Sequence, residues 1–514
     1  MPKKPLIFLA WIFFLKGLCF GSPLLETENF NLFLETYLRN DLITFTNVTD
    51  LDSGNKDDAS TYLGIDYHLG LKAVSKNKGP TFYLMLERNG PSDFSAPLFV
   101  RHNPKTQGGV KGPMTSGGTV GEYRNEKLLP QAEEFWLDTP LFDNLGLKIG
   151  LYTYEVGTGI SLNGSFENYG LTLYKESEDF IWRLYYCRPD IVYKNPLGPN
   201  VPQDKEQGFE YNHNASNFFA TDAKFNINKI CLNPYIGALS DYTSSGKRDN
   251  IFSAPIKRDI LGTLGMSLSL SQDKLSSTIE LAHNFGKAES ASSEHKDVYH
   301  TGYFAYSKLE YKIKELTPYI QFLLCSGNKA TPDMAKDQDS TLISGKNRAF
   351  SYTSPLNRNL GDSISGGINS AARPVIAMGS GYGLDYGVPR PGTFASADFD
   401  DLVMPSLGFS WELAKEVPLC LDLYYIRSFT KPVGTLDGQG EYLSQELGYE
   451  IDLSLDYKFN KNLVVGFLAG YFLPGRYYRE KRDDTSGSLF SPFVRGDGNA
   501  NSAYQIEMSV EFQF

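Results

Sequence analysis

The clearest pattern in the chain is a strict alternation of apolar and polar residues over positions 446–459, ELGYEIDLSLDYKF. Apolar and aromatic residues occupy the odd positions, and charged or small residues occupy the even positions. Successive side chains of a β-strand point to opposite faces, so the segment predicts a strand with one apolar face and one charged face. At roughly 3.3 Å per residue it would extend about 46 Å, far longer than the five or six residues typical of soluble strands.

Alternating runs of this kind recur along the whole chain and predict eighteen strands, an even number. We expect the strands at 31–45, 61–74, 80–87, 131–140, 146–155, 168–176, 179–188, 214–226, 229–241, 258–271, 275–287, 298–313, 316–327, 402–414, 417–429, 445–459, 462–473 and 501–514. The last strand ends on Phe514 and resembles the closing strand of bacterial outer-membrane barrels, where it serves as an assembly signal. This resemblance implies the barrel-assembly machinery as a partner.

The connections between these strands are short and long in turn. Segments such as 76–79, 272–274 and 460–461 leave room only for tight turns, whereas every second connection is long. A transmembrane barrel combines short periplasmic turns with large outer loops in this way, and its closure satisfies every backbone group in lipid. The sequence therefore predicts an all-β fold, a transmembrane antiparallel β-barrel of about 18 strands.

The composition agrees with a barrel once the alternation is taken into account. The chain has 34 Phe and 32 Tyr, yet its mean hydropathy is −0.31. Only every second residue of a barrel strand faces lipid, so a hydrophilic average does not argue against a barrel. No interior run of roughly 18 apolar residues exists, and this excludes membrane-spanning helices.

The N-terminus has the pattern of a secretory signal peptide. Lys3 and Lys4 precede an apolar segment at 5–20, and small residues follow at 21–22. We expect residues 1–21 to be removed and residues 22–514 to form a single barrel domain in the bacterial outer membrane. The remaining 46 Lys and Arg against 60 Asp and Glu give a net charge of −14, which argues against a nucleic-acid partner.

The same parity predicts which polar side chains point into the lumen. An Arg or Lys on the lipid face near the midplane would cost about 2–4 kcal/mol, so the charged face of each strand is expected inside. These side chains either form ion pairs that hydrate the channel or contact a hydroxylated or carboxylated solute. The candidate lumen residues are Glu35, Arg39, Asp41, Asp66, His68, Lys148, Tyr152, Arg183, Asp222, Lys224, Asp422, Tyr424, Glu450, Asp452 and Asp456.

Signals of enzymatic chemistry are weak. The six histidines form no HExxH or other metal-ligand spacing, and no G-x-S-x-G motif is present. We therefore expect no catalytic site, no metal and no cofactor. Two alternatives to a channel are a barrel enzyme such as a lipid hydrolase, and an adhesin whose loops bind partners.

Two C-terminal motifs resemble those of the alginate-export outer-membrane porins. In that family an L-G-x-E-x-D strand precedes a hydrophobic strand ending in F-x-P-G; here the residues are Leu447, Gly448, Glu450, Asp452, Phe472, Pro474 and Gly475. A second similarity is EEFWLDTP followed by GLKIGLYTYEVGTGISLNG, although Leu151 stands where the family usually has Arg. The resemblance implies an 18-stranded barrel that passes an anionic polysaccharide through an Arg-rich pore. The lumen predicted here holds more acids than bases.

The leading hypothesis is a monomeric porin for passive passage of polar, saccharide-like or carboxylated solutes, with a polysaccharide as the cargo that the resemblance implies. Outer-membrane lipid and lipopolysaccharide would surround it.

The long loops 88–130 and 328–401 are rich in Gly, Pro, Ser and Asn, and we expect them to fold into the pore mouth. Deleting 328–401 should then raise the single-channel conductance in planar bilayers. Unchanged conductance would show that the loop lies outside the pore as a flexible surface segment.

Overall fold

The computed structural model describes residues 23–46, 60–77, 79–89, 131–142, 144–152, 154–159, 161–162, 169–188, 217–241, 256–290, 296–329, 345–350, 353, 374, 401–415, 417–437, 439–480 and 500–513. The expected signal peptide, Phe514 and most of loops 88–130 and 328–401 lie outside these ranges. The predictions made for those segments stay predictions.

Eighteen strands of seven to seventeen residues form the wall, and they correspond one to one with the predicted strands. They are β2 (Phe30–Thr46), β3 (Ser60–Ser75), β4 (Thr81–Asn89), β5 (Gln131–Phe142), β6 (Leu145–Leu151), β7 (Tyr169–Glu176), β8 (Phe180–Cys187), β9 (Asn217–Ile227), β10 (Ile230–Asp241), β11 (Ile256–Gln272), β12 (Leu275–Ser290), β14 (Tyr303–Tyr311), β15 (Leu316–Cys325), β17 (Leu402–Ala414), β18 (Val417–Ser428), β21 (Glu446–Asn460), β22 (Leu463–Pro474) and β23 (Ala503–Gln513).

The remaining elements are short and do not belong to the eighteen wall strands. They are β1 (Leu25–Glu26), β13 (Val298–His300), β16 (Lys346–Asn347), the hairpin of β19 (Val433–Leu436) and β20 (Gln439–Tyr442), and the single helical turn α5 (Arg476–Arg479). Among the described residues, no helix is long and apolar enough to cross a bilayer.

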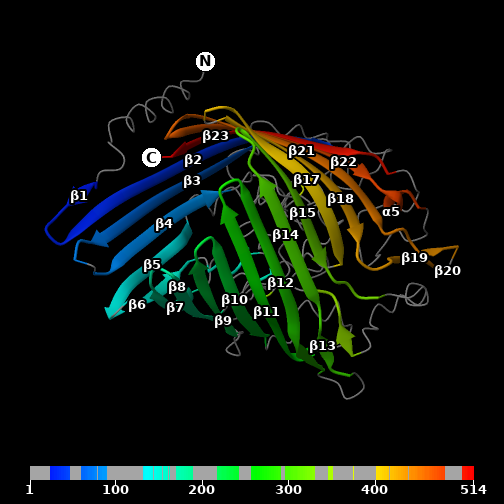
Figure 1. Ribbon diagram of the computed structural model, residues 1–514, viewed down its shortest axis with the longest axis horizontal. Coiled ribbons are helices and arrows are strands. Elements are labelled where there is room, and N and C mark those ends of the chain that lie inside the picture. The colour runs from blue at the N-terminus through cyan, green and yellow to red at the C-terminus, as the bar shows by residue number, and fades with distance from the viewer. Residues whose placement is uncertain are drawn as a thin grey trace, which may run out of the picture.

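The sheet closes on itself. Each wall strand pairs antiparallel with the next along the chain. The last strand, β23, then pairs with the first, β2, in a ladder from Tyr37↔Gln513 to Thr46↔Tyr504. Figure 1 shows the red β23 beside the blue β2. The predicted fold class, a closed antiparallel barrel, is confirmed.

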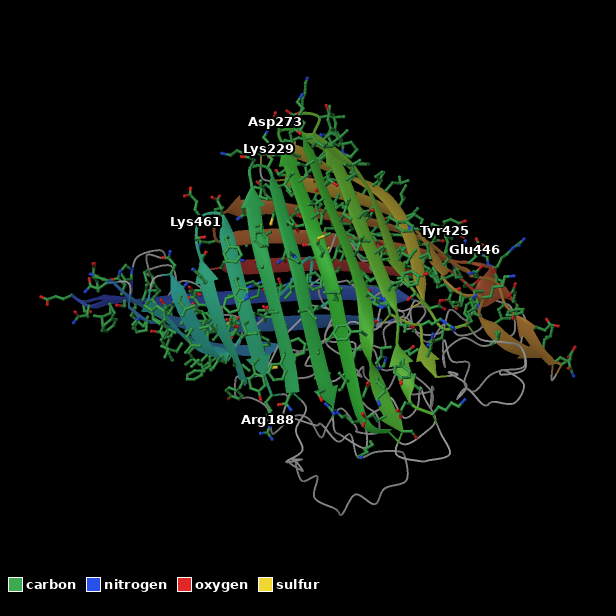
Figure 2. All side chains as sticks on the ribbon, turned by 60° about the horizontal axis from the view of Figure 1, so that its bottom comes forward. Arg188, Lys229, Asp273, Tyr425, Glu446 and Lys461 are labelled. Carbon is green, nitrogen blue, oxygen red and sulfur yellow. The ribbon has the colours of Figure 1, made fainter. Side chains whose placement is uncertain are left out.

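One end of the barrel, here called the turn end, carries the tight turns, and the other, the loop end, carries the long connections. Four turns contain a residue with positive φ: Asn144 (65°), Asn228 (54°), Asp273 (40°) and Lys314 (55°). Asn and Asp tolerate this left-handed conformation because their short polar side chains bond locally. Figure 2 shows the turn residues Lys229 and Asp273 at the opposite end of the strands from Arg188.

The outer face is an apolar band between two aromatic girdles. The band consists of exposed aliphatic side chains such as Leu184, Ile236, Leu264, Leu281, Ile320, Leu407, Ile451 and Met508. The turn-end girdle includes Phe142, Tyr311, Trp411, Tyr457 and Phe459, and the loop-end girdle includes Tyr169, Tyr299, Tyr303, Tyr449, Tyr471 and Tyr504. Aromatic residues are enriched where a barrel crosses the two lipid–water interfaces, so the band marks the lipid-facing surface.

Two predicted strands are wrong in extent. The strand expected over 146–155 leaves the wall after Leu151, next to Gly150 at φ 135°, where a side chain would collide with the Phe135 carbonyl. The strand expected over 298–313 is interrupted between β13 and β14, because the backbone of Thr301 bonds Asn347 rather than a neighbouring wall strand.

A charge placed on the lipid face tests the assignment of the band. Leu264 lies halfway along β11 and is 55% exposed, so Leu264→Arg should lower the free energy of unfolding in lipid vesicles by about 2–4 kcal/mol. Leu413→Arg, in the turn-end girdle, is the matched control and should cost about 0–1 kcal/mol. Equal losses at the two positions would contradict the membrane placement.

Candidate functional site

A segment between β6 and β7 crosses the interior of the barrel. This inner loop, defined as residues 152–162, connects two adjacent strands yet contacts β8, β9, β10 and β12. It lies on the face of those strands opposite the exposed side chains Leu184, Phe219 and Ile236, so it lies inside the lumen. Residues 153 and 160 lie outside the described part of the chain.

Apolar packing holds the inner loop against the wall. Tyr154 stacks on Tyr185 of β8 with ring centroids 4.4 Å apart and an interplanar angle of 9°. Val156 and Leu162 are fully buried in the same cluster. Gly237 of β10 makes room for Leu162, since a Cβ there would lie 2.2 Å from Leu162 Cδ1. Burial of such side chains contributes about 1.5–3 kcal/mol each, so the loop is packed like a core.

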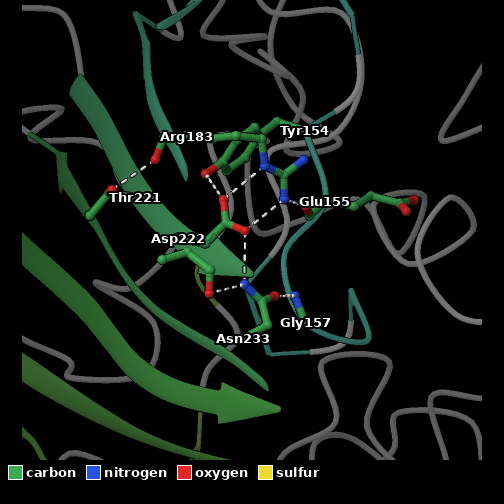
Figure 3. A network of polar contacts seen from close by, with 8 residues as sticks. Tyr154, Glu155, Gly157, Arg183, Thr221, Asp222 and Asn233 are labelled. Carbon is green, nitrogen blue, oxygen red and sulfur yellow. Dashed lines mark hydrogen bonds and ion pairs between the residues drawn. The ribbon is translucent and has the colours of Figure 1, made fainter. Parts of the chain in front are cut away.

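The carboxylate of Asp222 on β9 is the first polar anchor of the inner loop (Figure 3). Arg183 of β8 donates two hydrogen bonds of 2.9 Å to its two oxygens. The hydroxyl of Tyr154 and the side-chain amide of Asn233 also donate to it, each at 2.9 Å. Burial and then the neighbouring carboxylate raise the pKa of Tyr154, so its hydroxyl stays protonated as a donor.

Arg183 and Asn233 also bind the backbone of the loop. Arg183 Nη2 donates to the carbonyl of Glu155 at 2.8 Å, and the Asn233 side-chain oxygen accepts from the Gly157 amide at 3.0 Å. Burial raises the pKa of the Glu155 carboxyl, and Lys224 and Arg183 act in the opposite direction. The wall therefore fixes the loop through backbone and side chains together.

Glu280 on β12 is the second polar anchor and is fully buried. It accepts from the Thr158 amide at 2.7 Å, from the Ser161 hydroxyl at 2.6 Å and from the Tyr235 hydroxyl at 2.5 Å. A buried carboxylate is stable only when donors satisfy it, and these three do so. Gly157 adopts φ 62°, and a Cβ there would lie 2.9 Å from Glu280, so glycine is required at this approach.

Described parts of the 328–401 loop also reach the interior wall. Leu162 and Thr353 form a parallel bridge, and Thr353 contacts Thr263 of β11, Oγ1 to Oγ1, at 2.7 Å. At the loop end, Asn347 and the pair of His300 and Asp259, whose contact distance is 2.8 Å, are all buried. The inner loop is thus continued by a second inserted segment.

The wall opposite the inner loop is acidic. This acid sector consists of Asp422, Glu450, Asp452, Asp456 and Glu507 on β18, β21 and β23. In the strand register Asp422 faces Asp452, and Tyr424 faces Glu450.

An ion pair crosses into the acid sector from β2. Arg39 of β2 binds Glu507 at 3.2 Å across the closing seam, with both side chains buried. Asp422 also accepts a hydrogen bond from Tyr319. Asp422, Glu450, Asp452 and Glu507 are all buried, so this wall gathers several acidic side chains at short range.

The structure brings most of the predicted lumen residues into two groups. Arg183, Asp222 and Lys224 lie at the inner loop, and Lys148 stands 4.1 Å from the Trp136 ring and 4.3 Å from the Tyr152 ring. Arg39, Asp422, Tyr424, Glu450, Asp452 and Asp456 belong to the opposite wall. Glu35 and His68 are separate from both groups and lie at the turn end of β2 and β3.

Asp41 and Asp66 are described only in their backbones, where Asp41 pairs with Gly64 and Asp66 with Arg39. The sequence reasoning missed the inner loop, including Tyr154, Thr158 and Ser161. A signal for it was the sequence VGTG at 156–159, whose two glycines both adopt positive φ.

The C-terminal motifs that resemble those of the alginate-export porins form one structural corner. Gly448 adopts φ 152° at the start of β21, and the Gly475 amide bonds the Leu447 carbonyl at 2.8 Å. A Cβ at Gly475 would lie 2.4 Å from the Glu446 carbonyl. The tight corner directs the chain into α5, whose Tyr477 and Tyr478 are buried. These glycines therefore have a packing role.

Together, the closed sheet, the apolar outer band with its girdles and the charged interior define a transmembrane β-barrel of the bacterial outer-membrane class.

Solved structures from Pseudomonas aeruginosa have similar folds. They include OpdQ (12% identity, covering 94% of this chain and 97% of that chain, TM-score 0.49) and OccK8, or OprE (10%, 94% and 98%, 0.49). The outer membrane protein OprD is also similar (10%, 96% and 96%, 0.48). No protein-family model matches the sequence, and no curated protein matches it.

The Asp222 anchor gives a direct test of the inner loop. Asp222→Ala leaves Arg183 and Tyr154 without their shared acceptor and should lower the free energy of unfolding by about 3–5 kcal/mol. It should also increase the open-channel current noise. The double variant Arg183→Ala with Asp222→Ala should recover part of the stability, because no uncompensated charge remains.

Asp179→Ala, in an exposed turn, is the matched control and should leave both readouts unchanged. An unaltered unfolding free energy in Asp222→Ala would contradict the anchoring role.

Proposed function

We propose that the protein is a monomeric outer-membrane channel that lets small polar solutes pass down their concentration gradient, with cations favoured over anions. The observation that carries the proposal is the acid sector facing the lumen of a closed barrel. Lipid and lipopolysaccharide would surround the outer band, and passage would require no cofactor.

The electrostatics of the acid sector support cation preference. Rings or rows of Asp and Glu side chains select cations in channels because they lower the free energy of a cation in the pore. Asp422 and Asp452 are direct neighbours in the strand register, so a cation beside them would interact favourably with both carboxylates. Among the described residues, Arg39 binds Glu507 of the sector, and Lys308 interacts electrostatically with Asp422.

The remaining lining suits hydroxylated solutes. Tyrosine hydroxyls and carboxylates offer both donors and acceptors to sugar hydroxyls. A carboxylated solute would have to pass along the opposite wall, where Lys148, Arg183 and Lys224 lie. Arg183 is already bound to Asp222, so fewer charges are available there than the sequence suggests.

Alginate export stays a prediction of the motif resemblance. The acid sector has the wrong sign for a polyanion, and the shared glycines have packing roles at the β21–β22 corner. We therefore propose neutral and cationic polar solutes as the first cargo to test.

The barrel-assembly machinery remains a proposed partner. Its expected signal is the C-terminal strand ending at Phe514, and β23 is the strand that closes the barrel against β2. Closure by this strand supports the proposal, because an assembly factor that binds it would control the last step of sheet formation.

Reversal potentials in planar bilayers test the function. Under a potassium chloride gradient, the reconstituted protein should conduct and give a potassium-to-chloride permeability ratio above one. Asp422→Asn with Asp452→Asn should move that ratio toward one, because two lumen charges are removed. Asp273→Asn removes an exposed turn charge, keeps a residue that tolerates positive φ and should leave the ratio unchanged.

A folded, heat-modifiable protein that gives no conductance would refute the channel. Conductance with anion preference would refute only the role of the acid sector.

A further inference from the structure

A separate pocket of about 490 Å³ lies at the turn end of the barrel, beside the closing seam. One side is formed by β2, β3 and β4, and the other by the β21–β22 turn and the end of β23. Its lining includes Glu35, Tyr37, His68, Tyr83, Asn462 and Gln513. The inner loop and the acid sector contribute none of its lining residues, so the pocket is a distinct site.

The pocket combines aromatic rings with planar polar groups. Tyr37 and His68 lie with ring centroids 4.9 Å apart, and the hydroxyl of Tyr83 donates to Glu35 at 3.1 Å. Gln513 and Asn462 supply amides. The Asn462 side chain donates to the Gln513 backbone carbonyl at 2.5 Å and the Gln513 side chain donates to Glu511, so both amides are held in position. Aromatic faces pack against the C–H faces of a sugar ring, while amides and carboxylates bond its hydroxyls.

Size and charge narrow the ligand class. Pockets for small ligands measure about 300–1,000 Å³, and 490 Å³ is at the smaller end of that range. The lining carries the carboxylate of Glu35 and the ammonium of Lys461, which have opposite charges, so a net charge on the ligand is not required. These features favour a neutral hydroxylated ring over a simple ion.

The shape of the pocket depends on a glycine. A Cβ at Gly70 would lie 3.1 Å from the Tyr83 hydroxyl and 3.3 Å from Glu35 Cβ. A side chain at this position would therefore require Tyr83 and Glu35 to shift by a few tenths of an ångström. The absence of a side chain at Gly70 therefore helps to keep the pocket open.

We propose that this turn-end pocket binds one neutral sugar ring at the periplasmic mouth of the barrel. The inference rests on the proposed channel function only in that the pocket lies at the end of the solute path. Binding itself is an equilibrium property that can be measured without transport.

Saturation-transfer NMR on the full-length protein in nanodiscs tests the proposal, with D-glucose as the probe and the acyclic polyol sorbitol as its control. Glucose should give a signal and sorbitol a much weaker one, because only the ring can stack. Tyr83→Ala and Gln513→Ala should each reduce the glucose signal about fivefold or more, which corresponds to the loss of one ring contact or one hydrogen bond.

Tyr306→Ala, a lumen aromatic on β14 away from the pocket, is the matched control and should retain the signal. Heat-modifiable migration establishes which variants fold; if Tyr83→Ala does not, Gln513→Ala at an exposed strand end decides the question.

Three results would overturn the proposal: no glucose signal from the folded wild type, equal signals from glucose and sorbitol, or an unchanged glucose signal in the pocket variants. The same preparations are recorded in planar bilayers. Conductance without glucose binding would refute the sugar site and leave the channel function standing. Glucose binding without conductance would refute the channel function and leave the sugar site standing.

Discussion

The structure depends on the requirement that no backbone amide or carbonyl be left unpaired in lipid. A sheet can meet it only by closing, and here β23 returns to β2 after the chain has passed through the whole wall. Closure gives every strand one face toward lipid and one face toward the lumen. Successive side chains of a strand must therefore alternate between apolar and polar. The apolar band, the girdles and the charged interior all follow from that division.

Once closed, a barrel of this width encloses more space than its own wall side chains fill, and the interior is shaped by added chain. The inner loop is held on the β8–β12 side by two buried carboxylates, whereas the β18–β23 side keeps its acids facing the lumen. The channel is therefore asymmetric. One wall carries the inner loop with its packed aromatic rings, and the other carries the acid sector.

The strands of the wall could be predicted from the sequence because each strand and each tight turn is specified by residues that are neighbours in the chain. Alternation over 446–459 specified both a strand and its two faces, and the structure places a strand at Glu446–Asn460. Likewise, short segments such as 272–274 could only be turns, and Asp273 adopts the positive φ that such a turn needs.

The interior was not predictable in the same way, because its contacts join residues far apart in sequence. Ser161 and Thr158 both donate to Glu280, which lies more than 100 residues further along the chain. The alternation of polar and apolar residues carries no information about contacts of this kind. Alternation also continued past Leu151 in the sequence, although the chain there turns into the lumen. The alternation of side chains predicted that Arg183 and Asp222 point into the lumen, but it could not show that they bind each other.

The position of the inner loop has a consequence for the order of folding. Its described wall anchors lie between β6 and β12, so a partial sheet of these hairpins can carry the loop in place while the barrel is still open. The pair of Arg39 and Glu507, by contrast, joins residues 468 positions apart and cannot form before the two ends of the sheet meet. Contacts of short separation form at lower entropic cost than contacts of long separation. We therefore expect the inner loop to reach its place before the seam between β2 and β23 forms.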